Sequence, residues 1–131
     1  MSINARGIHH IVDYKWEEND GIPNEYFHYK VFFEIEKIIN KTSLKIVHKN
    51  LCMLPLKGDT SEIGGTLFYQ LDSSHFSLHS YYDTKILAID FFSCGDSDTV
   101  LAMKEIDDLL KSIIPSMKII FRHTLPRFHY Q

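Results

Sequence analysis

The sequence predicts an α+β fold, a two-layer sandwich in which two helices cover one face of a mainly antiparallel sheet in the order β-α-β-β-β-β-α-β. Six short apolar segments are bounded by polar or turn residues, and two of them alternate apolar with polar residues as half-buried strands do. Two longer segments repeat apolar residues at intervals near 3.6, which is typical of helices with one buried face. Because the central strands follow one another without an intervening helix, the helices are expected on one side of the sheet.

The first half of the chain contains one predicted helix between two strands. A strand is expected within Gly7–Asp13, followed by a polar loop with glycine and proline over Lys15–Pro23. Asn24 can cap a helix, and a second strand is expected over Leu44–His48, followed by a loop over Lys49–Gly65. The apolar residues that recur at helical spacing are Phe27, Val31, Ile35, Ile38 and Ile39.

The middle of the chain is predicted to be strands joined by short turns. Thr66–Asp72 alternates apolar and polar residues, and in the next strand Phe76 and Leu78 alternate with His75, Ser77 and His79. After a break at residues 82–84, Ile86–Phe92 is apolar on both faces apart from Asp90, which predicts a central strand covered on two sides. It ends at Cys94, which places a thiol at a strand end.

The last third of the sequence predicts a helix and a final strand. Residues 96–98 (Asp-Ser-Asp) offer caps for a helix that Pro115 ends. Its apolar positions are Leu101, Ile106, Leu109, Leu110 and Ile113. A strand is expected over Met117–Leu125 and an aromatic, basic tail over Pro126–Gln131.

Length and composition predict one domain over residues 1–131. The formal net charge of −3 and the absence of a basic block argue against a nucleic-acid partner. The start of the chain does not read as a signal peptide, and no apolar run approaches the ~18 residues of a membrane span. A cytoplasmic protein without membrane association is therefore expected, with Cys52 and Cys94 as free thiols.

Residues that could take part in catalysis cluster in the stretch Leu71–Gly95, which reads LDSSHFSLHSYYDTKILAIDFFSCG. His79 follows Ser74 by five positions and Cys94 follows it by twenty. This spacing, with Ser74-His75 and Cys94-Gly95, resembles the prokaryotic-type S-adenosylmethionine decarboxylases, whose segment reads roughly ESHxxIHTxPE followed by an aliphatic strand and DxFTCG. The resemblance extends more weakly over most of the chain.

The resemblance implies a pyruvoyl-dependent decarboxylase that acts on S-adenosylmethionine for the synthesis of polyamines such as spermidine. In that family a serine hydroxyl attacks the preceding carbonyl, the peptide becomes an ester, and β-elimination leaves a pyruvoyl group, with no metal. By resemblance the cleaved bond is Ser73–Ser74 and the cofactor derives from Ser74. His79 is then the acid/base of processing and Cys94 the proton donor to the product.

Two further site residues and the assembly also follow from the resemblance. Thr66, eight positions before Ser74, stands where the family has a processing serine, and its hydroxyl could stabilise the processing intermediate. Asp83 stands where the family has a glutamate that holds the ribose hydroxyls of the substrate. The family forms dimers with sites near the interface, so a homodimer is expected.

Three departures from the family pattern leave alternatives open. Ser73 replaces the usual glutamate before the cleaved serine, Tyr82 replaces a proline, and Thr60 stands where a phenylalanine stacks on adenine. The substrate could therefore be another amino acid, such as arginine or ornithine. Alternatively, the chain could be a non-catalytic homologue that serves as a binding or regulatory subunit.

The residues themselves also allow other chemistries. His75 and His79 with either cysteine could bind zinc, although no C-x-x-C or H-E-x-x-H motif accompanies them. Ser74, His79 and Asp90 could form a hydrolytic triad, although no nucleophile-elbow glycines flank the serine.

The first strand carries two adjacent histidines in a stretch where the resembling family opens with G-x-H-x-x-x-D. Neighbouring residues of a strand point to opposite faces, so His9 and His10 are poor partners for one shared site.

Overall fold

The computed structural model describes residues 6–17, 25–54, 64–95 and 98–128. The elements follow in the predicted order: β1 (Gly7–Lys15), α1 (Glu25–Asn40), β2 (Ile46–Leu54), β3 (Gly64–Leu71), β4 (His75–Tyr81), β5 (Ile86–Cys94), α2 (Thr99–Ile113) and β6 (Lys118–Arg127). The strands form one sheet in the order β2-β3-β4-β5-β1-β6, and each neighbouring pair is antiparallel. The predicted α+β sandwich is confirmed.

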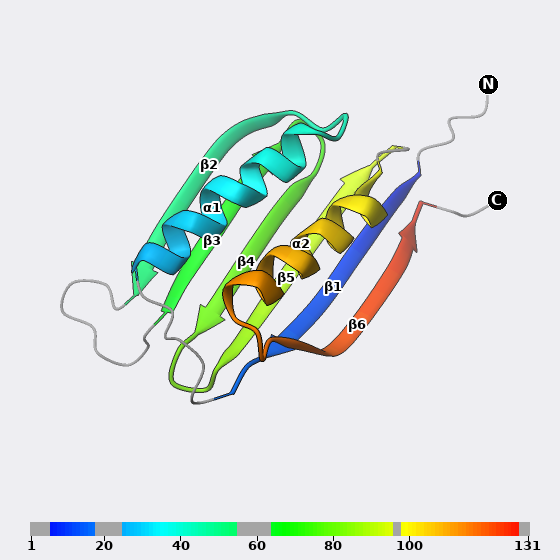
Figure 1. The fold of residues 1–131 in the computed structure, drawn as a ribbon. Helices are drawn as coiled ribbons and strands as arrows, with labels where there is room; N and C mark the ends of the chain where they lie inside the picture. Colours follow the sequence, from blue (N-terminus) through cyan, green and yellow to red (C-terminus); the bar gives the residue numbers. More distant parts are fainter. Residues whose placement is uncertain (1–5, 18–24, 55–63, 96–97, 129–131) are drawn as a thin grey trace, which may run out of the picture.

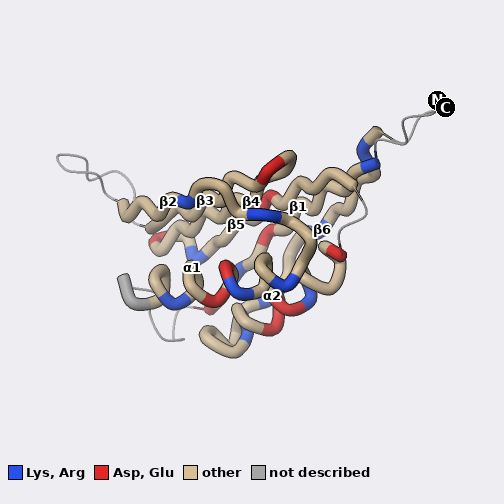
Figure 2. The backbone as a smooth tube through the Cα atoms, turned by 90° about the horizontal axis from the view of Figure 1, so that it is seen from above, with Lys and Arg blue, Asp and Glu red and all other residues tan. Residues whose placement is uncertain are grey.

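Both helices lie on the same side of the sheet, so the described part of the chain has two layers. Figure 1 shows α1 running over the β2–β3 half and α2 over the β5–β1 half. Figure 2, seen from above, shows both helices below the sheet and no described segment covering its other side. We call this uncovered side the open face. Its residues on β3, β4, β5 and β1 are Thr66, Phe68, Gln70, His75, Ser77, His79, Tyr81, Ile86, Ala88, Asp90, Phe92, Cys94, His9, Ile11 and Asp13.

The hydrophobic core lies between the sheet and the two helices. Along each central strand every second residue is buried, as a period of two requires. The predicted apolar stripe of α1 is buried, and α2 buries residues three and four apart. Burial of one such large apolar side chain stabilises the fold by roughly 1.5–3 kcal/mol.

The predicted loop over Lys49–Gly65 is wrong at both ends. β2 continues to Leu54, and β3 begins at Gly64. β2 is an edge strand in which residues 47–50 are all exposed, so its sequence lacks the alternation that marks a half-buried strand. Residues 55–63 of this stretch lie outside the described residues.

The strand β5 is central in the sheet, yet the described residues cover only its helix side. Residues at alternate positions from Ile86 to Cys94 are only half-buried, because they belong to the open face. The last strand is longer than predicted and includes Pro126, which the sequence analysis assigned to the tail. Because β6 is an edge strand, a proline without an N–H group can be accommodated there.

The boundaries of α2 follow from local signals in the sequence. Asp98 accepts a hydrogen bond from the backbone N–H of Leu101 at 3.2 Å, which confirms one of the predicted caps. The helix ends at Ile113, just before Pro115 as predicted. The other proposed caps, Asn24 and residues 96–97, lie outside the described residues. Among the described helices, neither combines the length and apolar character that a membrane crossing requires.

Candidate active site

Thr66 and His79 meet on the open face, across neighbouring strands. Thr66 of β3 lies directly opposite His79 of β4. Oγ1 of Thr66 is 3.0 Å from Nδ1 of His79, which is a hydrogen-bond distance. His79 is exposed, so this contact lies at the surface of the described sheet. The hydroxyl and the imidazole that were expected to serve self-cleavage are thus in contact.

Two glycines at the start of β3 allow close packing behind this pair. A Cβ atom on Gly64 would lie 1.8 Å from the backbone oxygen of Ser80, and one on Gly65 would lie 2.5 Å from the imidazole of His28. The Nε2 atom of His28, in α1, is 3.0 Å from Oγ of Ser80. The strand that carries the threonine hydroxyl is therefore packed tightly against its neighbours.

Ser74 lies where the chain turns from β3 into β4, and its hydroxyl already has a partner. The backbone N–H of Leu71 donates to the carbonyl of Ser74 at 3.0 Å and closes the turn. Ser73 is exposed in this turn, whereas Ser74 is 8% exposed. The backbone N–H of Cys94 donates to Oγ of Ser74 at 2.9 Å. The bond expected to be cut is thus at the surface, while the attacking oxygen is held against the end of β5.

Cys94 ends β5 and lies opposite Gly7 of β1. The next residue, Gly95, has φ of 82°, in the left-handed region that favours glycine, and its N–H donates to the carbonyl of Arg6 at 2.6 Å. The thiol of Cys94 is free and half-buried. The structure thus brings together Ser74 and Cys94, which are twenty positions apart in the sequence.

The expected site residues form two groups at opposite ends of the strands. His79 stands five positions after Ser74 along extended backbone, which corresponds to about 16 Å at the usual rise per residue. Asp83 is exposed in the turn after β4, beyond His79 as seen from Ser74. One chain therefore holds Ser74 with Cys94 near one end of the open face and Thr66 with His79 nearer the other.

A cluster around Phe92 on the open face was missed by the sequence analysis. Nε2 of His9 is 2.6 Å from Oδ1 of Asp90, and Nη1 of Arg127 is 3.5 Å from Nδ1 of His9. The guanidinium of Arg127 lies 5.0 Å from the centroid of the Phe92 ring, and the His75 ring is 5.6 Å from it. Strand alternation would have predicted this shared face only if the pairing of β1 with β5 had been known.

A model of the S-adenosylmethionine decarboxylase family matches residues 8–123. The chain belongs to the S-adenosylmethionine decarboxylase family. Among solved structures, it is similar to the adenosylmethionine decarboxylase of Aquifex aeolicus, with a TM-score of 0.62 and 16% identity over 95% of this chain and 91% of that chain. At this identity the likeness shows the fold. No curated protein sequence matches the chain.

The alternative chemistries find no support in this member of the S-adenosylmethionine decarboxylase family. His79 contacts Thr66 and Asp90 contacts His9, so neither contact belongs to a triad with Ser74. Within residues 6–17, 25–54, 64–95 and 98–128, no group of three His, Cys, Asp or Glu side chains could hold a metal ion.

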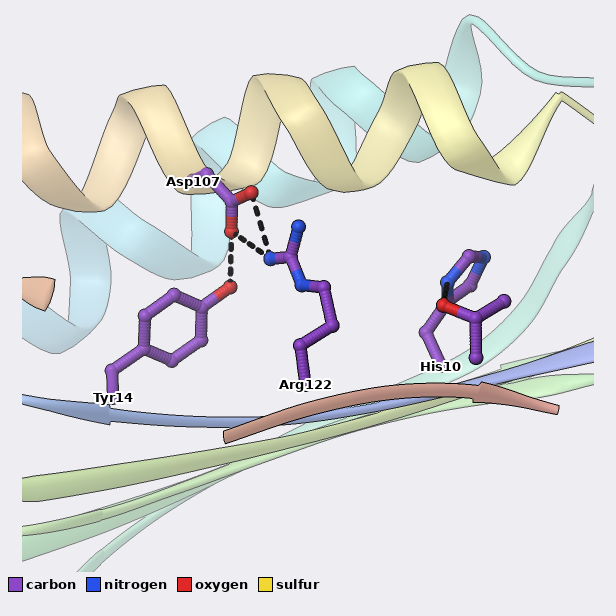
Figure 3. A network of polar contacts seen from close by, with 5 residues as sticks. His10, Tyr14, Asp107 and Arg122 are labelled. Carbon is purple, nitrogen blue, oxygen red and sulfur yellow. Dashed lines mark hydrogen bonds and ion pairs between the residues drawn. The ribbon is translucent and has the colours of Figure 1, made fainter. Parts of the chain in front are cut away.

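The other histidine of β1, His10, lies on the helix side of the sheet, where its Nε2 is 3.0 Å from Oγ1 of Thr99, so His9 and His10 face opposite ways as predicted. Figure 3 shows His10, Tyr14 and Arg122 pointing toward α2, away from the open face. Tyr14 donates to Asp107 at 2.5 Å, and Arg122 donates to both oxygens of Asp107 at 2.6 and 2.7 Å. Burial, followed by the hydrogen bond to Asp107, raises the pKa of Tyr14. The network of Tyr14, Asp107 and Arg122 connects α2 and β6 to β1.

His28 lies behind the Thr66 and His79 pair, on the helix side. It is fully buried, and burial lowers its pKa to about 4. Its ring stacks on Tyr82 with centroids 5.3 Å apart, so Tyr82, one of the departures from the family pattern, packs against α1. Nδ1 of His28 has no hydrogen-bond partner among the described residues. Thr60, the position of the missing adenine-stacking aromatic, lies outside the described residues.

Proposed function

We propose that this chain decarboxylates S-adenosylmethionine for polyamine synthesis after cutting its own backbone between Ser73 and Ser74. The observation that carries the proposal is the 2.9 Å hydrogen bond from the Cys94 backbone N–H to Oγ of Ser74. It holds the attacking oxygen beside an exposed turn, and an N–H donor stabilises negative charge on that oxygen when its proton leaves. Membership of the family supports the reaction class.

The residues around Ser74 fit a pyruvoyl group made from that serine. Such a group supplies a conjugated carbonyl that accepts the electron pair left when carbon dioxide departs. The chain offers a half-buried thiol, Cys94, beside this position, and decarboxylation replaces a C–COO⁻ bond with a C–H bond, which requires one proton. We propose that Cys94 delivers this proton, and that Asp83 binds the ribose of the substrate.

A homodimer would unite the two groups that one chain keeps about 16 Å apart. Ser74 needs a proton-transfer group for processing, yet within the described chain His79 contacts Thr66 further along the sheet. The open face exposes the large apolar side chain of Phe68, and β6 exposes that of Phe121. Packing the open faces of two copies together would bury this surface and could place Thr66 and His79 of the second copy at Ser74 of the first.

Denaturing mass spectrometry tests self-cleavage directly. The purified protein should yield fragments of residues 1–73 and 74–131, the second blocked at its N-terminus. Ser74→Ala is the matched control and should remain whole. An intact 15.3 kDa wild-type chain after long incubation would contradict the proposal.

Co-expression of two inactive variants tests the shared site. Neither Ser74→Ala nor His79→Ala alone should process at the wild-type rate. When both are made in one cell with different tags, the His79→Ala chain should be cut, because it keeps its serine and borrows a histidine from the other copy. If the mixture is no better cut than the separate variants, the site is contained in one chain and this role of the dimer is wrong.

The choice of substrate is tested by measuring carbon dioxide release from S-adenosylmethionine, arginine and ornithine. Tyr82, which replaces the family proline, stacks on the buried His28 on the helix side of the sheet. We therefore expect S-adenosylmethionine to be preferred by a wide margin. Faster release from arginine or ornithine would reassign the substrate while keeping the reaction.

The Ser73→Glu variant separates a working enzyme from a non-catalytic homologue. Because Ser73 is exposed in the turn, a longer side chain fits there without displacing the core. If the wild type cuts itself, restoring the family glutamate should change little. Should the wild type stay whole and Ser73→Glu become cut, the natural protein is a homologue that has lost processing.

A further inference from the structure

The register between β1 and β5 places His9 beside Cys94 on the open face. Cys94 lies opposite Gly7, and Phe92 lies opposite His9. In an antiparallel pair the diagonal neighbours stand about 7–8 Å apart between Cα atoms, within reach of long side chains. His9 is therefore the diagonal neighbour of Cys94 on one side of Phe92, and of Asp90 on the other. Gly7 has no side chain that would separate the imidazole from the thiol.

The two nitrogen atoms of His9 point in different directions along the sheet. Nε2 is 2.6 Å from the carboxylate of Asp90, and an ionised carboxylate only accepts hydrogen bonds, so Nε2 carries the proton. Nδ1 is left with its lone pair, 3.5 Å from Nη1 of Arg127. Arg127 stands across Gly7 from Cys94 in the same row of paired residues. Nδ1 therefore faces the row that contains the thiol.

The surroundings of His9 combine charge with access to solvent. The side chain of His9 is 18% exposed and that of Asp90 is 46% exposed. The other titratable or charged groups that face His9 are Cys94 on β5, His75 on β4, and His123 and Arg127 on β6. The guanidinium of Arg127 lies over the Phe92 ring, 5.0 Å from its centroid.

We propose that His9, oriented by Asp90, is the proton partner of the Cys94 thiol. This inference rests on the proposed function for its role in turnover. When the S–H proton of Cys94 passes to the substrate carbon that has lost carbon dioxide, the thiolate remains. Nδ1 of His9 then takes a proton from solvent and passes it to Sγ, so that both groups return to their starting states. Asp90 holds Nε2–H throughout, so that Nδ1 is the atom that exchanges.

Carbon-13 NMR of the cysteine Cβ atoms tests this pair without requiring activity. The intact protein, labelled at cysteine and carrying Cys52→Ser, is titrated from about pH 5 to pH 10. We expect His9→Gln to raise the titration midpoint of Cys94 by roughly one pH unit, because a glutamine amide cannot take up the thiol proton as Nδ1 of His9 can. The glutamine amide can still donate to Asp90, and His9→Asn is a second variant in case His9→Gln misfolds. His123→Gln, on the same face, is the matched control and should leave the midpoint unchanged.

If the titration midpoint of Cys94 is the same in wild type, His9→Gln and His9→Asn, the proposal is wrong, whether or not the chain is an active decarboxylase. In the processed enzyme, His9→Gln should lower turnover with S-adenosylmethionine while self-cleavage stays complete. Added imidazole should restore part of the lost turnover in His9→Gln but not in Cys94→Ala. A purely structural role of His9 would not produce this difference. A wild type that shows the coupled titration but releases no carbon dioxide would refute the proposed function and leave the Cys94 and His9 pair standing.

Discussion

Oγ1 of Thr66 lies 3.0 Å from Nδ1 of His79 across the ladder between β3 and β4. If this hydroxyl stabilises the processing intermediate, Thr66→Val should slow self-cleavage about 10²- to 10³-fold, the usual cost of one lost oxyanion donor. Thr66→Ser keeps the hydroxyl and should process at nearly the wild-type rate. The cleaved fraction over time, measured by mass spectrometry, decides the question, and equal rates for the valine and serine variants would remove Thr66 from the site.

Replacing Ser74 and replacing His79 should block self-cleavage at different steps. Ser74→Ala lacks the oxygen that forms the ester, so no later step can occur. His79→Ala lacks a proton-transfer group, for which losses of about 10²–10⁴ are typical, so processing should stall at the ester. Hydroxylamine cleaves esters and should cut the chain of His79→Ala but not that of Ser74→Ala. Equal scission of both variants would show that the two roles are assigned wrongly.

Gly65 and His28 should be energetically coupled. A Cβ atom on Gly65 would lie 2.5 Å from the imidazole of His28, so Gly65→Ala should lower the free energy of unfolding by about 1–3 kcal/mol. In a His28→Ala background the same change should cost much less. Urea unfolding of uncut Ser74→Ala protein gives these values. Gly95→Ala is the control, because its cost comes from φ of 82° and should not depend on His28.

The stability of the fold should fall as the pH drops from about 6.5 to about 4. Burial lowers the pKa of His28 to about 4, so the unfolded chain binds a proton there at a higher pH than the folded one. Folding is therefore opposed increasingly below the unfolded pKa, by up to about 3 kcal/mol once the pH reaches 4. Burial also lowers the pKa of His10, which adds a loss of the same sign. In urea titrations His28→Gln should flatten this dependence, whereas the exposed His123→Gln should keep it.

The parts of the fold that the sequence predicted are those whose burial is periodic. The stripe from Phe27 to Ile39 and the alternating residues 75–79 bury regular positions, so their spacing alone indicates the element. The edge strand β2 has four consecutive exposed residues, 47–50, and no such signal. Its second half was consequently predicted as a loop.

The part of the candidate site that depends on residues close together in the sequence was predictable. A two-residue turn at residues 72–73 fixes the register of β3 and β4, which puts Thr66 opposite His79. The contact between His9 and Asp90 spans 81 positions and depends on β1 pairing with β5. Residues near His9 in the sequence do not specify that pairing, because it depends on how all the strands assemble into one sheet.

Self-cleavage in the β3–β4 turn would make the refolding of this protein depend on its concentration. The fragment that contains β1 would have that strand inserted between β5 and β6 of the other fragment, and β3 would remain paired with β4. The two pieces would thus be interlocked and would stay together without a covalent link. After denaturation, however, they would have to find each other by diffusion, so recovery would depend on concentration, whereas the uncut chain could refold at any dilution.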